Sequence, residues 1–293
     1  MELQVIELED KIILRDIEDF EAKDIFECGQ AFRWQKEEDG SYTTVAYGRF
    51  LNVRREGSDI VLSPTNREDF DQIWYRYFDL ATDYSRIKEE LSGDKILSQA
   101  TAYGQGIRIL NQEPFETIIS FIISANNQIP RIKKSVEILA REYGDFIGNY
   151  RGRDYYSFPG PEVLARLSPQ ELREKARVGF RDKRIVDTAQ MIEGGQVDLA
   201  GIFEMTKDEG KKELQKLAGV GPKVADCCLL FAFEKGDAFP VDTWVKRVME
   251  HFYLEEETSL KKIGDKGHEL FGQLAGYAQQ YLFYYAREEE IGK

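Results

Sequence analysis

Two reactive side chains stand out in the C-terminal third of the chain, a lysine at position 223 and an aspartate at position 242. Lys223 directly follows the glycine-rich run Gly219-Val220-Gly221-Pro222. A primary amine is a nucleophile once it has lost its proton, and a carboxylate stabilises positive charge that develops in a transition state. Held together beside a phosphate-binding bend, the two groups suit attack on a sugar carbon of DNA.

The segment from about 211 to 233 predicts two helices joined by a glycine bend. Gly219 and Gly221 permit positive φ angles and let a phosphate approach the backbone. Pro222 suits the first turn of the second helix, whose free amides form an anion site. The expected apolar seam between the helices is Leu214, Leu217, Val220 and Val224. This spacing is typical of a helix-hairpin-helix, and a helical corner without a ligand is the alternative.

The position of Lys223 at a helix N-terminus predicts a depressed pKa, because the helix dipole and partial burial both disfavour a cation. A solvated lysine that only reaches toward phosphate is the alternative. Asp242 precedes an apolar helix, so we expect it to act as an N-cap. We also expect the helix amides to keep this carboxylate ionised for catalysis.

The composition is that of an ordinary globular protein, with 293 residues, 42% hydrophobic and 32% charged. The net charge of −13 argues against nucleic acid, but residues 121–190 carry thirteen Lys and Arg against nine Asp and Glu. A basic face on an acidic body still binds a duplex. Three cysteines exclude a disulfide framework and a four-cysteine iron–sulfur cluster. No segment predicts a transmembrane helix or a signal peptide.

Short alternating segments predict five strands in the first part of the chain, at 11–16, 30–36, 41–48, 49–56 and 59–64. The turn signals between them favour antiparallel pairing. From about Arg67 onward the pattern is helical, with almost nothing that indicates a strand, and Ser168 with Glu171 predicts a capping box. The fold class is therefore α+β. We expect an N-terminal antiparallel sheet domain with flanking helices over 1–110 and a helical domain over 111–293.

Together, the hairpin motif and Pro240-Val241-Asp242 strongly resemble the helix-hairpin-helix glycosylases that carry a Gly/Pro-rich loop and a catalytic aspartate. Within that superfamily the chain is most similar to the 8-oxoguanine DNA glycosylase/lyases. Three further segments match in order, namely 28–34 (CGQAFRW), 124–132 (SANNQIPRI) and 276–283 (GYAQQYLF). The resemblance covers nearly the whole chain.

The resemblance implies the residues that grip DNA, since such an enzyme must extrude a base, fill the gap and read the orphaned partner. Asn126 would fill the gap, and Arg131 and Arg181 would bind the estranged cytosine. Phe180 would wedge beside it, where the family more often has tyrosine. Trp244 would also lie against DNA, at the position where animal members have a histidine that contacts phosphate. The backbone at Gly219 and Gly221 would bind phosphate.

The resemblance also implies a base pocket. Phe283 would stack on the extruded purine, and Gln279, one helical turn away, would read its Watson–Crick edge. Cys227 would cover the opposite face. The carbonyl of Gly29 would accept a hydrogen bond from N7–H, which oxidised guanine has and guanine lacks. The alternative for Cys227 is a small buried core residue, and the alternative for Gly29 is an ordinary turn glycine.

We therefore expect a bifunctional DNA repair glycosylase and AP lyase that excises 8-oxoguanine, preferably opposite cytosine. Lys223 would attack C1′ and form a Schiff base, and β-elimination would cut the strand. No cofactor is required, although a monovalent or calcium ion at the hairpin is implied. The partner is double-stranded DNA, with a monomer in the bacterial cytoplasm expected. An alkylated-base glycosylase on the same scaffold and a non-catalytic hairpin DNA-binding protein are the alternatives, while endonuclease-III-type enzymes are disfavoured by the missing cysteine cluster.

Overall fold

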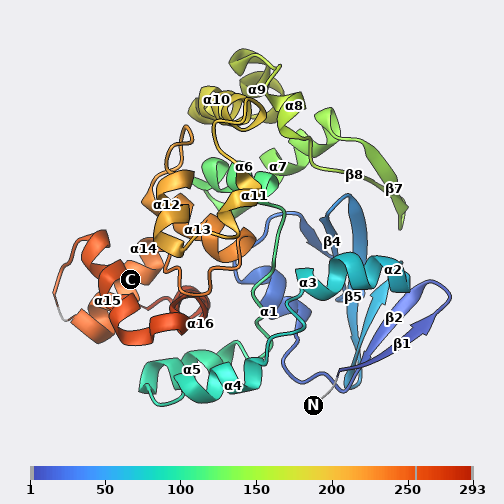
Figure 1. Cartoon of the computed structure of the whole chain (residues 1–293). Coiled ribbons are helices and arrows are strands. Elements are labelled where there is room, and N and C mark those ends of the chain that lie inside the picture. The colour runs from blue at the N-terminus through green and yellow to red at the C-terminus, as the bar shows by residue number, and fades with distance from the viewer. Residues whose placement is uncertain (1–2, 255, 292–293) are drawn as a thin grey trace.

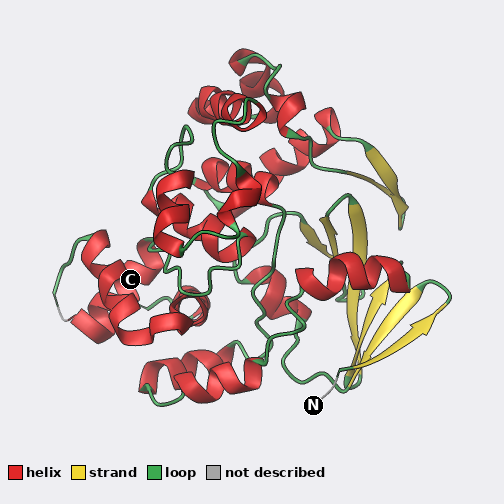
Figure 2. Ribbon diagram, viewed as in Figure 1, coloured by secondary structure: helices red, strands yellow, loops and turns green. Residues whose placement is uncertain are grey.

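A six-stranded antiparallel sheet forms one side of the molecule, and helices form the rest (Figures 1 and 2). The computed structural model describes residues 3–254 and 256–291. The strand order is β1-β2-β6-β5-β4-β3. The strands are β1 (Gln4–Leu8), β2 (Lys11–Arg15), β3 (Trp34–Lys36), β4 (Tyr42–Ala46), β5 (Arg49–Glu56) and β6 (Asp59–Ser63). The predicted α+β class with antiparallel pairing is confirmed.

The predicted turns form where their residues allow positive φ. Tyr47 and Gly48 join β4 to β5 with φ of 52° and 67°, as a two-residue hairpin turn requires. Strand β1 was not predicted, although it pairs with β2 along its whole length. The predicted strand at 30–36 is shorter than expected and begins at Trp34. Gln30 instead uses its side chain to bond the backbone of neighbouring segments.

A second antiparallel pair, β7 (Phe146–Tyr150) and β8 (Arg153–Tyr156), contradicts the expectation that almost no strand follows Arg67. Arg151 and Gly152 form its turn, with φ of 53° and 76°. The pair packs on the main sheet, where the Phe50 ring lies 5.1 Å from the ring of Tyr155. This contact joins residues more than a hundred positions apart, so the local pattern did not reveal it.

The helices in the first half of the chain are α1 (Ala22–Glu27), α2 (Arg67–Asp69), η1 (Phe70–Trp74), α3 (Tyr75–Tyr77), α4 (Tyr84–Leu91), α5 (Lys95–Tyr103), α6 (Pro114–Ser124) and α7 (Ile129–Tyr143). Those that follow are α8 (Pro161–Leu164), α9 (Pro169–Ala176), η2 (Gly179–Arg181), α10 (Asp182–Glu193), α11 (Leu199–Ile202), α12 (Lys207–Leu214) and α13 (Pro222–Ala232). The last are α14 (Thr243–Met249), η3 (Glu250–Leu254), α15 (Leu260–Phe271), η4 (Gly272–Leu274) and α16 (Ala275–Glu288).

Ser168 caps α9 by accepting from the amide of Glu171 at 3.1 Å, which confirms one half of the predicted capping box, whereas the Glu171 carboxylate accepts from Tyr143 and Lys175. The reciprocal bond that completes a capping box is present at α12, between Thr206 and Glu209. None of the helices in the described ranges is long and apolar enough to cross a membrane.

Three clusters of buried apolar side chains hold these elements together. One lies under the sheet, and a second lies between α6, α7, α10 and the hairpin. The third joins Leu97 of α5 to Val245 of α14 and Tyr281 of α16. Because α5 belongs to the first predicted domain and α16 to the second, this third cluster packs parts of the two predicted domains against each other (Figure 1).

Candidate active site

The predicted hairpin is present, with α12 and α13 joined by residues 215–221. Its expected seam is buried throughout, at Leu214, Leu217, Val220 and Val224. Gly219 has a φ of 86°, and a Cβ placed there would lie 3.0 Å from the Cδ of Arg184. Glycine is therefore required at this position by both its conformation and its neighbour.

Gly221 differs from the expectation of positive φ. Its φ is −87° and its ψ is −179°, an extended conformation that any residue adopts. A Cβ at this position would meet no atom within 4 Å. The open space beside Gly221 suits close approach of a phosphate to the backbone, which stays a prediction. Pro222 occupies the first turn of α13, as expected.

Lys223 is half-buried in the first turn of α13. Its Nζ lies 4.9 Å from the centre of the Phe121 ring and interacts with the thiol of Cys227. Burial lowers the pKa of Lys223, whereas Cys227 and Asp242 raise it, and the net direction is upward. The predicted depression of this pKa is therefore wrong for the unliganded protein. The resting amine is protonated and must lose a proton before it attacks.

Asp242 is the N-cap of α14 and accepts a hydrogen bond from the amide of Val245 at 2.8 Å, which confirms its predicted capping role. Burial raises the pKa of Asp242 more than the helix amides and Lys223 lower it. The helix amides thus favour the ionised form against the effect of burial, and the expectation that Asp242 is ionised for catalysis stays a prediction. Asp242 and Lys223 interact electrostatically, although they form no direct ion pair in the described structure.

The predicted pocket residues come from three elements that are far apart in sequence. Gly29 follows α1 with a φ of 84°, and a Cβ there would lie 3.0 Å from the Phe283 ring. Gln279 is buried on α16, and its Oε1 has no hydrogen-bond partner among the described residues. A buried polar atom without a partner costs free energy, so this oxygen suits a ligand donor.

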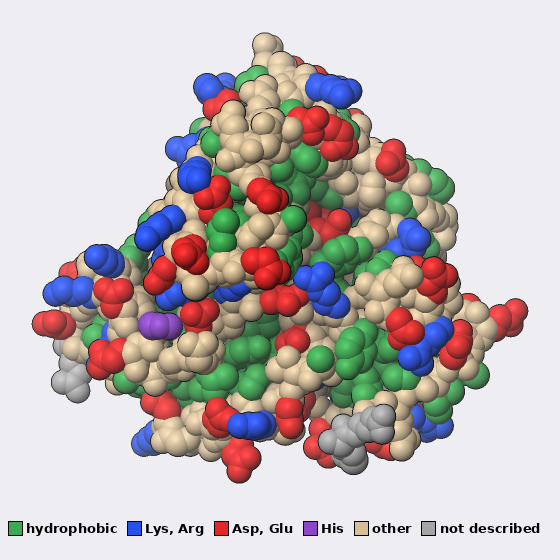
Figure 3. All heavy atoms as spheres, viewed as in Figure 1, with side chains coloured by type: hydrophobic (Ala, Val, Ile, Leu, Met, Phe, Trp, Pro, Cys, Tyr) green, Lys and Arg blue, Asp and Glu red, His purple; other side chains and the backbone are tan. Residues whose placement is uncertain are grey.

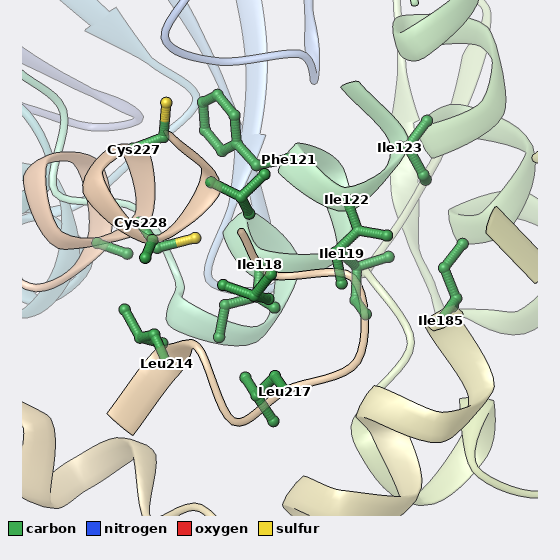
Figure 4. Close-up of a cluster of buried hydrophobic side chains, with 14 of the residues drawn as sticks. Ile118, Ile119, Phe121, Ile122, Ile123, Ile185, Leu214, Leu217, Cys227 and Cys228 are labelled. Carbon is green, nitrogen blue, oxygen red and sulfur yellow. The ribbon is translucent and has the colours of Figure 1, made fainter. Parts of the chain in front are cut away.

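Cys227 lies one turn after Lys223 and is buried, which raises the pKa of its thiol to about 11. It is therefore a neutral thiol at physiological pH. Figure 4 shows Cys227 beside Phe121, whereas Cys228 points into the cluster around Ile118. The adjacent cysteines thus face different surroundings, one near the amine and one in the core.

The predicted wedge residues are exposed, with Asn126 on the loop before α7 and Phe180 in the short helix η2. Asn126 is exposed with a φ of 52°, a conformation that asparagine tolerates better than most residues. Phe180 is 56% exposed, which is unusual for a large apolar side chain and fits a contact with bases. Arg181 lies 4.3 Å from the Phe180 ring, and Arg184 lies 5.6 Å from it.

Arg181 is buried and holds in place the loop at 125–128, which contains Asn126 and which we call the wedge loop. Its guanidinium donates to the carbonyls of Ala125, Asn126 and Val178. These bonds leave one N–H of Nη1 for a ligand, since guanidinium has five in total. Binding of the estranged cytosine by Arg181 stays a prediction, and the structure adds a second role as the anchor of Asn126.

Arg131 and Trp244 each lie in the first turn of a helix. Arg131 is exposed in α7, five residues after Asn126, and its contact with cytosine stays a prediction. Trp244 is half-buried in α14, and the guanidinium of Arg247 lies 5.1 Å from its ring. The Arg247 cation places positive charge beside Trp244, whose contact with DNA stays a prediction.

Three residues near the site were not predicted as functional. Phe121 supports the amine of Lys223, and Gln280 and Arg287 bond the segment around Gly29. Phe121 has the spacing of a core residue, so nothing local marks it. Gln280 is a polar residue within an otherwise apolar stretch of α16, and that mismatch is a signal for a buried hydrogen bond.

A cavity of about 620 Å³ lies away from these residues, between β3, β4, α7 and β8. It contains neither Lys223 nor Asp242, so it does not mark the reactive pair. In the described part of the chain no three His, Cys, Asp or Glu side chains are placed to hold a metal. At the hairpin, the carbonyls of Gly219 and Val220 accept no hydrogen bond from described residues and are oxygen donors of the kind that a monovalent or calcium ion prefers.

Charged side chains of both signs cover the face in Figure 3, and Lys and Arg side chains follow its left border beside α10 and α12. This border includes the hairpin and part of the basic region at 121–190.

Two family models together match most of the chain. Residues 12–118 match the 8-oxoguanine DNA glycosylase N-terminal domain, and residues 119–272 match the HhH-GPD superfamily of base excision DNA repair proteins. A probable N-glycosylase/DNA lyase of Methanothermobacter thermautotrophicus is 32% identical over 82% of this chain and 83% of its own length. The Arabidopsis thaliana N-glycosylase/DNA lyase OGG1 is 31% identical over 88% of this chain and 75% of its own.

Solved structures give the same result. Clostridium acetobutylicum 8-oxoguanine glycosylase/lyase, in complex with double-stranded DNA that has cytosine opposite 8-oxoguanine, is 46% identical with a TM-score of 0.96. That match covers 99% of this chain and 100% of the other. The 3-methyladenine DNA glycosylase of Archaeoglobus fulgidus shares the fold, with 21% identity and a TM-score of 0.74 over 97% of this chain and 99% of its own.

Proposed function

This chain belongs to the HhH-GPD superfamily of base excision DNA repair proteins and, within it, to the 8-oxoguanine DNA glycosylases, and from that premise we propose how its residues act. It excises 8-oxoguanine from duplex DNA and cuts the strand at the resulting abasic site. The observation that carries the proposal is the placement of Lys223 at the start of α13, within electrostatic reach of the half-buried Asp242.

Lys223 must first release a proton, because its pKa is raised in the resting protein. Burial raises the pKa of Asp242, and a carboxylate with a raised pKa accepts a proton more readily. As the glycosidic bond breaks, Asp242 passes this proton to the departing base, and the carboxylate that is left ionised stabilises the positive charge on the sugar. One carboxylate therefore serves the amine before attack and the sugar during it.

The covalent steps follow from the chemistry of an amine on C1′. The Nζ lone pair forms a bond to C1′ while the C1′–N9 bond breaks and the base leaves with its electrons. Opening of the sugar ring, with a proton going to O4′, gives a Schiff base. Loss of a C2′ proton then expels the 3′ phosphate by β-elimination, which cuts the strand on the 3′ side.

We assign the remaining residues to recognition. Gln279, Phe283, Cys227 and the Gly29 carbonyl bind the extruded base, and the unpartnered oxygen of Gln279 supports this assignment. Asn126 and Phe180 occupy the gap in the duplex, where exposure of the Phe180 ring supports a wedge. Arg131 and the free N–H of Arg181 bind cytosine, so we propose a preference for that opposite base.

The surroundings of the site include the DNA phosphates, an ion at the hairpin and the cell compartment. The backbone at Gly219 and Gly221 contacts phosphate, and Arg247 beside Trp244 adds positive charge there. The free carbonyls of the hairpin hold a monovalent or calcium ion that orders the loop, and the chemistry needs no other cofactor. We propose a monomer that acts on DNA in the bacterial cytoplasm, where its three free cysteines stay reduced.

The test is reduction with borohydride during incubation with a duplex that contains 8-oxoguanine. Wild type should form a covalent adduct and a nicked strand, while Lys223→Gln should give neither. Lys212→Gln, at an exposed position of the same hairpin, is the matched control and should match wild type. Excision and nicking by Lys223→Gln would refute the mechanism.

An alkylated-base glycosylase remains the alternative that the shared fold with the Archaeoglobus enzyme favours. Such an enzyme would remove 3-methyladenine and leave no adduct.

Nicking assays with 8-oxoguanine opposite each of the four bases measure the proposed preference for cytosine directly.

A further inference from the structure

The backbone carbonyls of residues 27–31, which we call the Gly29 segment, are held by side chains at every position except one. Four of these carbonyls each accept a side-chain hydrogen bond. The pairs are Arg287 Nη2 to Glu27 at 2.6 Å, Gln280 Nε2 to Cys28 at 2.8 Å, Gln112 Nε2 to Gln30 at 2.9 Å and Trp34 Nε1 to Ala31 at 2.9 Å. Within the described ranges, the carbonyl of Gly29 accepts none.

This arrangement restricts how the Gly29 carbonyl points. Its neighbours on both sides are fixed by bonds to α16 and to the chain at Gln112, so the peptide cannot rotate freely. The preceding carbonyl, that of Cys28, is bonded to a fully buried amide, since Gln280 is only 2% exposed. A buried side-chain bond of this kind is costly to break because both partners would lose hydrogen bonding.

Two of the four donors come from α16, which also carries Gln279 and Phe283. Gln280 is adjacent to Gln279, and Arg287 lies one helical turn after Phe283. A Cβ built on Gly29 would lie 3.3 Å from Arg287 Nη1 and 3.0 Å from the Phe283 ring. The same helix therefore places the base-stacking ring and fixes the segment opposite it.

Gln279 Oε1 and the Gly29 carbonyl are two oxygen acceptors without partners in the described structure. Oxidised guanine has N–H donors on both edges, N1–H and the amino group on the Watson–Crick edge and N7–H on the other. Guanine has a lone pair at N7 and would be repelled by a fixed carbonyl. Selectivity then depends on how rigidly the spacing between the two acceptors is held.

We propose that Gln280 and Arg287 are positioning residues that aim the Gly29 carbonyl at N7–H and thereby set selectivity for oxidised purines. The inference rests on the proposed function, in which this carbonyl reads the base. Neither residue contacts the reacting atoms. They act through the carbonyls of Cys28 and Glu27, and they tie the N-terminal half of the pocket to α16.

The experiment compares Gln280→Met and Arg287→Met with wild type in three single-turnover assays. These measure excision of 8-oxoguanine opposite cytosine, excision of guanine opposite cytosine, and cleavage of a preformed abasic site. Asn52→Leu is the matched control, because Asn52 is also a fully buried amide, and its two hydrogen-bond partners, Ser41 at 2.8 Å and Thr43 at 3.1 Å, lie in or next to β4 of the main sheet, outside the Gly29 segment.

Both variants should excise 8-oxoguanine roughly 10- to 100-fold more slowly, as expected when one oriented hydrogen bond is lost. Excision of guanine should not fall, and abasic-site cleavage should stay within about twofold, because an abasic site has no base to read. The Asn52→Leu variant should keep the wild-type ratio of 8-oxoguanine to guanine excision.

Equal loss of excision and abasic-site cleavage would show a merely structural role and overturn the inference. An unchanged ratio of 8-oxoguanine to guanine excision would overturn it as well. If Gln280→Met fails to fold, Arg287→Met decides, since its side chain is 18% exposed and less central to the core. Failure of wild type to excise 8-oxoguanine would instead refute the proposed function.

Discussion

The reactive pair and the wedge loop are opposite in character. Lys223 and Asp242 lie at the starts of α13 and α14, half-buried, and each has protein partners before DNA arrives. Asn126 and Phe180 are exposed, the first on a loop in a left-handed conformation and the second in η2 with its ring largely in solvent. Arg181, buried behind them, holds the loop around Asn126 to the body.

This difference separates chemistry from recognition. At the reactive pair the protein supplies the electrostatic environment itself, so a substitution there should change rate and pH dependence while binding persists. At the wedge loop the missing partner is DNA, so a substitution should change affinity and choice of opposite base. Each prediction below tests one side of this division.

The largest effect is expected for Asp242→Asn. Asparagine caps a helix as well as aspartate does, so α14 should stay folded. Removal of the carboxylate should slow 8-oxoguanine excision about 100- to 1,000-fold, because the cationic transition state loses its nearest anion. Single-turnover excision together with a DNA-binding titration separates the two properties.

The control for this variant is Asp198→Asn, because Asp198 caps α11 in the same way, through the amide of Ala200. It should excise at the wild-type rate. If Asp242→Asn instead lost DNA affinity with an unchanged rate of excision, the assignment of chemistry to this region would be wrong.

A smaller effect, on binding, is expected for Arg181→Met. The substitution releases the carbonyls of Ala125 and Asn126, so the wedge loop should lose its order before DNA binds. Affinity for lesion-containing duplex should fall roughly tenfold, as for loss of a buried charge-assisted hydrogen bond. Fluorescence anisotropy measures it, and Arg141→Met, an exposed position with the same charge change, is the control.

The separation of chemistry from recognition would be contradicted if Arg181→Met bound DNA normally but excised slowly at saturating enzyme. It would also fail if Arg141→Met lost as much affinity as Arg181→Met, since the effect would then be one of net charge alone.

A carboxyl that the fold shields from water, that of Glu116, should also affect the pH dependence of stability. Burial raises the pKa of Glu116 from 4.5 to about 8, even though Arg33 lies 3.7 Å away. Between these values the folded state binds a proton that the unfolded state releases, so the free energy of unfolding should fall as pH rises. The slope is up to about 1.4 kcal/mol per pH unit for one group.

Denaturant unfolding of wild type and Glu116→Gln between acidic and mildly alkaline pH measures this slope. The variant should lose much of it, whereas the exposed Glu90→Gln should keep it. Identical slopes in wild type and Glu116→Gln would mean that the carboxyl is ionised in the folded state.

The smallest effect is expected for Cys227→Ala. Cys227 raises the pKa of Lys223, so its removal should move the rising limb of the pH–rate profile to lower pH. Borohydride trapping on a preformed abasic site measures this without the base that Cys227 is proposed to cover. Cys228→Ala, whose side chain points into the core, should shift the limb less, and a shift to higher pH in Cys227→Ala would contradict the assignment.

Much of the architecture follows from the amino-acid sequence alone. Periodicity, turn dipeptides and capping residues predicted five of the strands, the hairpin and its buried seam, and the N-cap at Asp242. These features depend on residues a few positions apart, and near neighbours in sequence are always near in space. Each motif that identified the family is likewise a short run of consecutive residues, so it could be recognised without the fold.

Tertiary structure alone decided the rest. The pKa of Lys223 moves upward because Asp242 and Cys227 meet it in a buried environment, whose effect on charge no spacing rule contains. The pair β7 and β8 depends on Phe50, and the bond from Gln280 to Cys28 joins positions 252 residues apart. Desolvation and long-range hydrogen bonds arise only when distant segments pack together, so a linear reading finds the reactive groups but not the environment that controls them.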